Sequence, residues 1–173
     1  VIISGGIDLS VGAVIGLSGV VAAWTMANVL GLDQTVKGQD AWGGLLVGAA
    51  VSIGVGLLVG LINAFLINVL KIVPFIATLS TMGAALGLSV VISQGAPIGS
   101  ANDFALISSF SPQWNPLSPA LVVVIVVVTV LGLYLHKARV GLYTYAIGSN
   151  AFAARAAGIN VARHFTWVYA VSG

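Results

Sequence analysis

The sequence contains very little charge and lacks cysteine and glutamate altogether. Without cysteine, the chain can form no disulfides and offers no thiolate ligand to a metal. Charged residues make up 6% of the chain, whereas they make up about 25% of a typical soluble domain. The net charge of +2 is small and scattered along the chain, so nothing indicates a nucleic-acid partner.

Long uncharged stretches dominate the rest of the sequence, which is 59% hydrophobic and has a mean hydropathy of +1.12. They run over 9–32, 41–70, 72–102 and 104–136. A helix of about 20 apolar residues crosses the hydrocarbon core of a bilayer. We therefore predict an all-α, polytopic transmembrane helical bundle with about four full spans. These spans lie near 9–30, 43–69, 74–92 and 120–135.

Both ends of the chain are apolar as well. The chain opens inside the run VIISGGI and stops within HFTWVYAVSG, where a fifth span begins. We therefore predict partial spans at both ends and expect the chain to be an internal part of a longer protein. The absence of a signal peptide then carries no information.

Basic residues indicate which side of the membrane each connection faces, because cytoplasmic loops are enriched in Lys and Arg. The segment 136–164 holds four of the six basic residues and no acidic residue. We predict that this segment is a cytoplasmic loop. With four spans, the connections over 31–42 and 93–119 are then external, and the turn at Lys71 is cytoplasmic.

Within that loop, the stretch GSNAFAARAAGIN at 148–160 predicts a short helix. Ser149 or Asn150 can accept from free backbone N–H groups at its start, and the alanines that follow favour helix. Gly158 suits the left-handed position that ends many helices. By helical spacing, the apolar residues share one face with Arg155 beside them; these are Phe152, Ala156 and Ile159. A helix of about two turns is unstable alone in water, so it needs a partner surface.

A second polar feature interrupts the apolar opening of the chain. Gly5 and Gly6 predict a break in the backbone before the first full span. Asp8 or Ser10 can cap the helix that follows. An ionisable residue at membrane depth is a functional hypothesis by default, although we favour helix capping over contact with a transported solute for Asp8.

The predicted spans also carry small and polar residues at positions that suit helix packing. Glycines four residues apart, such as Gly56 and Gly60, allow helices to approach closely in lipid. Asn63 and Thr78 lie on neighbouring spans and are predicted to form interhelical hydrogen bonds. Lining of a translocation pathway is the alternative role for both residues.

Three motifs together resemble the permease subunits of ribose-type ABC sugar importers. They are GGIDLSVG at 5–12, INAFLINVLKIVPFIATLSTMGAALG at 62–87, and YAIGSNAFAARAAGINV at 145–161, the last followed by VYAVSG at 168–173. The resemblance covers nearly the whole chain, in the same order and spacing. It implies that residues 1–173 are part of a single transmembrane permease domain in the inner membrane of a bacterial cell.

The resemblance also implies partners. Two permease subunits pair in the bilayer as a homodimer, a cytoplasmic ATPase subunit binds below, and an external sugar-binding protein delivers the substrate. The chain itself would bind no cofactor, because ATP is used by the ATPase subunit. The sequence has no Walker lysine loop of its own.

The helix near 150–158 matches the element through which such a permease couples to its ATPase. The implied coupling residues are Asn150, Phe152, Ala153, Ala154, Arg155, Ala157, Gly158 and Ile159. Many family members carry an acidic residue just after the Asn of this motif, whereas Ala151 and Phe152 stand there in this chain. We therefore expect apolar docking through Phe152 and the alanines to replace a polar contact.

The predicted function is that of a non-enzymatic membrane subunit of an ATP-driven importer for a monosaccharide or similar small polar solute. Candidate residues for the helix break or the translocation pathway are Gly5, Gly6, Asp8, Ser10, Asn63 and Thr78. An ion-coupled secondary transporter is the alternative, since broken helices occur there too. A membrane-embedded enzyme is disfavoured, because the predicted spans contain no Cys, Glu or His for catalysis.

Overall fold

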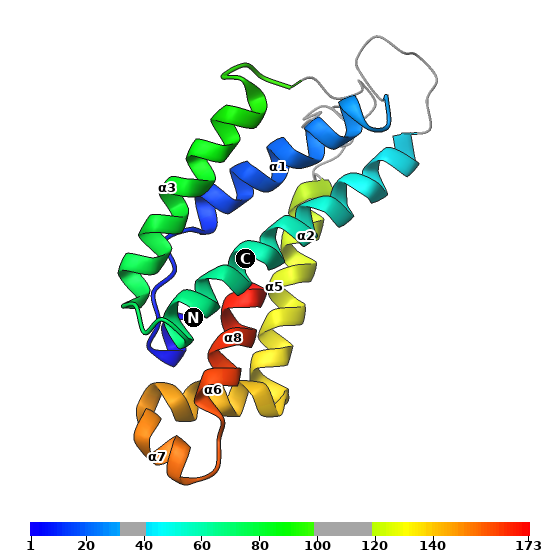
Figure 1. The fold of residues 1–173 in the computed structure, drawn as a ribbon. Coiled ribbons are helices and arrows are strands. Elements are labelled where there is room, and N and C mark those ends of the chain that lie inside the picture. Colours follow the sequence, from blue (N-terminus) through cyan, green and yellow to red (C-terminus); the bar gives the residue numbers. More distant parts are fainter. Residues whose placement is uncertain (32–40, 99–118) are drawn as a thin grey trace.

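The computed structural model describes residues 1–31, 41–98 and 119–173, and the regular elements in these ranges are all helical (Figure 1). The predicted external connections over 31–42 and 93–119 therefore lie mostly outside the described residues. The elements are the 3₁₀ turn η1 (Ile2–Ser4) and the helices α1 (Val11–Asn28), α2 (Ala41–Asn68), α3 (Pro74–Ser93), α5 (Pro119–Lys137), α6 (Arg139–Ser149), α7 (Ala151–Ala156) and α8 (Val161–Ser172).

Three of these helices are long and apolar enough to cross a membrane, namely Val11–Asn28, Leu46–Asn68 within α2, and Pro74–Ser93. They pack against one another with α1 between α2 and α3 (Figure 1). Their small shared core consists of Ala13, Val14, Leu17, Val59 and Ala85. Much of the remaining apolar surface is exposed, as expected for helices whose outer faces meet lipid. The predicted all-α polytopic bundle is thus confirmed.

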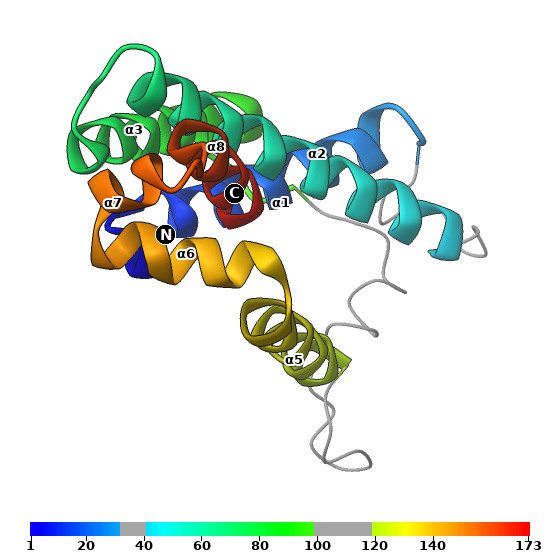
Figure 2. The ribbon, with the colours of Figure 1, turned by 90° about the horizontal axis from the view of Figure 1, so that it is seen from below.

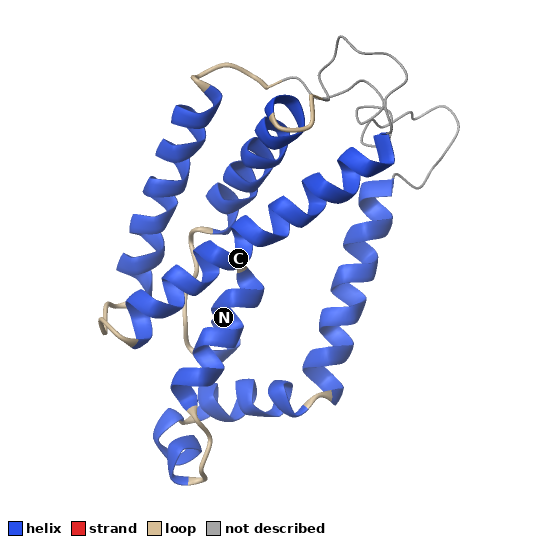
Figure 3. Cartoon of the chain, turned by 45° about the vertical axis from the view of Figure 1, so that its right-hand side comes forward, coloured by secondary structure: helices blue, strands red, loops and turns tan. Residues whose placement is uncertain are grey.

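The fourth predicted span has a different form from the other three. Helix α5 ends at Lys137, and the chain then bends by 73° into α6, so that the two helices together can count as one broken span (Figure 3). Its run of exposed valines stands apart from the α1–α3 layer (Figure 2). Gly141 lies in close contact with α5 just after this bend, because a Cβ there would overlap the carbonyl of Leu135.

The predicted cytoplasmic loop over 136–164 is mostly helical in the structure, and α6 is an element that the sequence analysis missed. Thr144 and Ile147 of α6 are buried. Ile147 packs with Ala154 of α7 and Val161 of α8 in a second small core. Helices α6 and α7 and the first turn of α8 therefore form a helical subdomain at one end of the molecule, and the rest of α8 runs back along α2 (Figure 1).

Helix α8 packs tightly along α2, and two glycines make this possible. A Cβ on Gly60 would overlap the carbonyl oxygen of Tyr169, and a Cβ on Gly56 would overlap that of Gly173. The predicted close packing at this glycine pair is therefore confirmed, and its partner is α8.

Candidate functional site

The break before α1 depends on two glycines for different reasons. Gly5 has a φ of 84°, a left-handed conformation that costs little only for glycine. Gly6 has no such angle, but a Cβ there would lie 2.6 Å from the hydroxyl oxygen of Tyr169. The extended segment that follows is held from two sides. The fully buried Tyr169 donates to the Ile7 carbonyl at 3.3 Å, and the Thr78 hydroxyl lies 3.4 Å from the same oxygen.

Asp8 lies in this extended segment, and its carboxylate accepts three hydrogen bonds. One oxygen accepts from the backbone N–H of Ser10 at 3.0 Å and from the Ser10 hydroxyl at 2.6 Å. The other accepts from the hydroxyl of Ser172 at 2.8 Å. Ser10 occupies the N-cap position of α1, but its side chain makes no capping bond. The carboxylate of Asp8 therefore serves both to order the start of α1 and to tie it to the last turn of α8.

The hydrogen bonds continue from Ser10 into the bundle. Ser10 accepts from the Asn63 amide nitrogen at 3.0 Å, and the Asn63 amide oxygen accepts from the Thr81 hydroxyl at 2.7 Å. Asn63 is 1% exposed, so these bonds satisfy an amide that would otherwise be costly to bury. We call the resulting chain of contacts the polar relay; its members are Ser172, Asp8, Ser10, Asn63 and Thr81.

The polar relay joins four elements of the structure, namely α8, the break before α1, α2 and α3. It contains one ionisable group and no histidine. Among the described residues, no group of three or more His, Cys, Asp or Glu side chains could hold a metal ion. The arrangement is thus suited to fixing the positions of these helices relative to one another.

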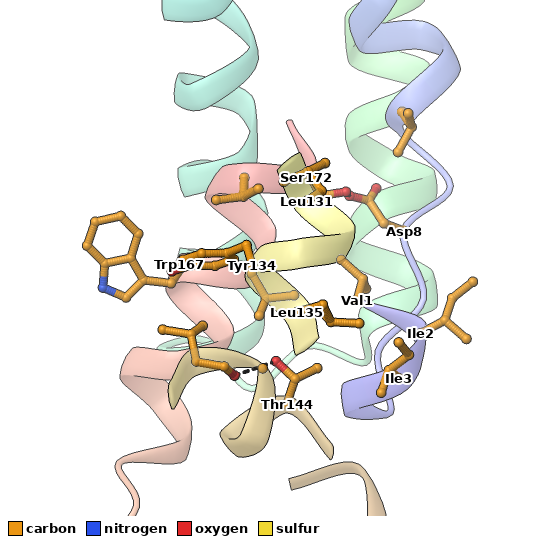
Figure 4. Close-up of a pocket in the computed structure, with 15 residues that line it drawn as sticks. Val1, Ile2, Ile3, Asp8, Leu131, Tyr134, Leu135, Thr144, Trp167 and Ser172 are labelled. Carbon is orange, nitrogen blue, oxygen red and sulfur yellow. Dashed lines mark hydrogen bonds between the residues drawn. The ribbon is translucent and has the colours of Figure 1, made fainter. Parts of the chain in front are cut away.

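Asp8 and Ser172 also line a pocket of about 760 Å³ between η1, α5, α6 and α8 (Figure 4). Most of its wall is apolar, with contributions from Leu131, Tyr134 and Trp167. Asp8 is the one charged side chain among the lining residues. The sequence prediction placed Gly5, Gly6, Asp8, Ser10, Asn63 and Thr78 in one group, and the structure brings them together around the break.

The second candidate region is α7, the short helix predicted near 150–158. The Asn150 side-chain oxygen accepts from the backbone N–H groups of Phe152 and Ala153 at 3.0 and 2.9 Å, so Asn150 is the capping residue. Gly158 has a φ of 83°. The Ile159 N–H closes the helix end on the Ala154 carbonyl at 3.0 Å. The local prediction of cap and stop residues thus matches the geometry.

The two sides of α7 face different surroundings. Phe152 is 81% exposed, whereas Ala154 is 4% exposed and packs in the core with Ile147. Ile159 also packs against that core, so the predicted common face of Phe152 and Ile159 is wrong. Because the helix ends before Gly158, helical spacing no longer applies to Ile159. Other implied coupling residues are exposed, namely Ala153, Arg155, Ala157 and Gly158.

Two asparagine side chains, Asn160 and Asn68, fix the start of α8. Asn160 caps it by accepting from the Arg163 N–H at 3.0 Å. The Asn68 amide on α2 donates to the Ala162 carbonyl and to the Thr166 hydroxyl, both at 3.0 Å. The two bonds from Asn68 hold the first turns of α8 against α2.

His164 adds a buried contact between α8 and α6. Its Nε2 lies 3.0 Å from the hydroxyl of Thr144. Burial lowers the pKa of His164 below its ordinary value, because it removes water from the charged imidazolium. The imidazole is therefore neutral near pH 7, and its role here is structural.

Taken together, the long apolar helices, the broken helix before α1 and the helical subdomain define part of a multi-pass α-helical membrane protein. A protein family described as "Branched-chain amino acid transport system / permease component" matches residues 1–173, and the chain belongs to this family.

Curated relatives match almost the whole chain. The "Probable ABC transporter permease protein y4mJ" of Sinorhizobium fredii is 39% identical over 99% of this chain and 47% of its own length. The ribose import permease protein of Bacillus subtilis is 37% identical over 100% of this chain and 50% of its own. The fructose import permease protein of Bifidobacterium longum is 32% identical over 100% of this chain and 46% of its own.

These matches confirm the resemblance to permeases of sugar importers that the three motifs predicted. The chain spans about half the length of the curated relatives it matches. No solved structure matches the chain.

Proposed function

We propose that the chain is part of the membrane-spanning subunit of an ATP-driven importer for a monosaccharide or a similar small polar solute. Support comes from the permease family and from relatives whose names refer to ribose and fructose import. The observation that carries the proposal is α7, a capped helix that presents Phe152 at the end of the molecule formed by the helical subdomain.

Helix α7 has the properties of a docking element for a separate ATPase subunit. Its inner side is anchored by Ala154 and Ala151, while Phe152, Ala153 and Ala157 are exposed. Short helices bind partner proteins by laying such a face into a groove. ATP would be bound and hydrolysed by the ATPase, and this chain would supply the surface that senses closure of the ATPase subunits.

The path from α7 into the membrane runs through α8. This helix has 12 residues and is therefore about 18 Å long. Its first turn follows α7, and its last turn contacts Asp8 through Ser172. A push on α7 would then move α8 against the break before α1, which fits transport by rigid-body rearrangement.

The remaining parts of the proposal follow from the same assignment. A second permease subunit, in a homodimer, would complete the pathway, and an external sugar-binding protein would deliver the solute. The protein would lie in the bacterial inner membrane, with 136–164 cytoplasmic and with 31–42 and 93–119 external. The basic residues of the first of these segments support this orientation.

The test uses the full-length permease in proteoliposomes, with and without its ATPase and binding protein. We expect sugar uptake only when the ATPase and ATP are present. Phe152→Ala should weaken ATPase binding and slow uptake by about tenfold, because truncating a central aromatic anchor commonly costs more than 1 kcal/mol. Phe65→Ala is the matched control, since Phe65 is exposed on α2 and should leave ATPase affinity unchanged.

An ion-coupled secondary transporter is the second candidate, because Asp8 lines a pocket at the break before α1. The same vesicles separate the two proposals. Uptake that is driven by a proton or sodium gradient without any ATPase would contradict the importer assignment and would favour the secondary transporter.

A further inference from the structure

Two basic residues from distant parts of the chain line one pocket beside α7. Lys71 comes from the turn between α2 and α3, and Arg155 comes from α7 itself. The pocket has a volume of about 500 Å³, and Asn68 and Asn160 also line it. Its lining residues include no acidic side chain. We call it the basic pocket.

Neither cation has a carboxylate partner within the described ranges. Asp8 is the one acidic residue of the sequence that falls in residues 1–31, 41–98 and 119–173. Its two oxygens are already engaged by Ser10 and Ser172. Both Lys71 and Arg155 are exposed. The basic pocket therefore holds two positive charges that are available to an anionic group from outside the described residues.

The backbone at Lys71 is a second, independent observation. Its φ is 58°, in the left-handed region, and the next N–H, that of Ile72, closes the end of α2 on the Leu66 carbonyl at 3.1 Å. Glycine normally occupies this position at a helix end. A residue with a Cβ there costs roughly 1–2 kcal/mol. Gln94 ends α3 in the same left-handed conformation. What sets Lys71 apart is that its side chain also lines the basic pocket.

We propose that the basic pocket receives a carboxylate side chain of the ATPase subunit, next to the docking site of Phe152. This inference rests on the proposed function, and it adds a charged contact to the apolar one. Arg155 belongs to the same six-residue helix as Phe152. A partner that covers Phe152 would therefore lie close to Arg155, three residues further along α7.

The exposure of both cations bears on when a carboxylate of the ATPase subunit would bind in the basic pocket. Lys71 and Arg155 are both exposed, so water and salt screen their charges in the free permease. A carboxylate bound in the pocket would attract both cations. Covering by the partner removes water and strengthens both attractions. The permease would thus contribute two cations to the interface.

Lys71→Gly provides a sharp test, because it removes the ammonium group and at the same time suits the left-handed backbone. We expect ATPase affinity to fall roughly 10- to 100-fold, the loss typical of a charge-assisted hydrogen bond. The thermal midpoint of the full-length permease should stay the same or rise. Arg155→Gln should weaken binding to a similar extent. Lys137→Gln is the matched control, because Lys137 is basic but does not line the basic pocket.

Salt supplies a second readout of the same contact. The affinity of the wild-type permease for its ATPase, measured from 50 to 500 mM NaCl, should fall more steeply than that of a Lys71→Gly/Arg155→Gln double variant. If both variants bind the ATPase with the wild-type affinity and salt dependence, the inference is overturned while the proposed function stands. If the wild-type permease binds no ATPase, both are overturned.

An anionic lipid headgroup is the competing occupant. Nanodiscs with and without phosphatidylglycerol distinguish the two in the absence of ATPase. Thermal stabilisation by this lipid that disappears in Lys71→Gly, together with unchanged ATPase affinity, would assign the basic pocket to lipid and overturn the proposal. The proposal predicts the opposite result, with reduced ATPase affinity and no difference in lipid stabilisation between wild type and variant.

Discussion

Replacement of Asp8 by asparagine tests whether the carboxylate holds the break together or takes part in transport. Asparagine has nearly the same shape, so its oxygen can still accept from the Ser10 N–H and hydroxyl. Its nitrogen can donate to the Ser172 hydroxyl, which reverses the direction of that bond. The three contacts of the wild-type carboxylate are thus retained without their charge.

The magnitude follows from the number of bonds. Hydrogen bonds to a charged group contribute roughly 1.5–3 kcal/mol each, and neutral ones roughly 0.5–1.5. Asp8→Asn therefore loses about half of what Asp8→Ala loses, and removing a charge from membrane depth offsets part of that loss. We expect a small decrease in the thermal midpoint for Asp8→Asn and a decrease at least twice as large for Asp8→Ala.

The assay combines thermal unfolding of the purified full-length permease with ATP-driven uptake in proteoliposomes. If Asp8 is structural, Asp8→Asn transports at a rate close to that of wild type. Ser172→Ala is the control that removes one contact while the charge remains. An Asp8→Asn protein of normal stability and insertion that fails to transport would refute the structural reasoning and would assign the charge itself a role in translocation.

Two further substitutions probe the packing of α8. Gly60→Ala should lower the thermal midpoint, because its Cβ would overlap the Tyr169 carbonyl and overpacking of this kind costs about 1–3 kcal/mol. Gly54→Ala on the same helix meets no described atom within 4 Å and should be neutral; equal effects of the two substitutions would contradict the close approach. For His164, whose pKa is lowered by burial, the unfolded chain takes up a proton as the pH falls through about 6.5 while the folded protein does not. Stability should therefore decrease from pH 7.5 to pH 5.5 in wild type and remain nearly constant in His164→Gln, and a wild-type profile as flat as that of the variant would show that the imidazole is not buried in its neutral form.

The sequence was most informative where structure depends on neighbouring residues. The cap at Asn150, the stop at Gly158 and the approximate positions of the long helices all follow from local rules, because each involves residues a few positions apart. The glycine pair at Gly56 and Gly60 was also recognisable. That α8 is the helix packed against this pair could not be predicted, because the four-residue spacing of glycines indicates close packing but does not identify the partner helix.

Contacts between distant residues were not predictable in the same way. Ser172 and Asp8 are 164 positions apart, and Tyr169 and Ile7 are 162 apart. Serine and tyrosine in an apolar helix give no signal that would identify such partners. Helix α6 was missed for a related reason: charge bias marked 136–164 as a connection, whereas burial of Ile147 against α7 and α8 makes part of it helical.

These distant contacts give α8 its place in the proposed mechanism. At its first turn, Asn68 and His164 fix it to α2 and α6. At its last turn, Ser172 and Tyr169 hold the break before α1. A helix fastened at both ends moves as a unit, so a displacement of α7 cannot be absorbed between Asn160 and Ser172. The polar relay then extends that displacement to α2 and α3, which makes the break, rather than any single binding residue, the point where docking at α7 would act on the membrane helices.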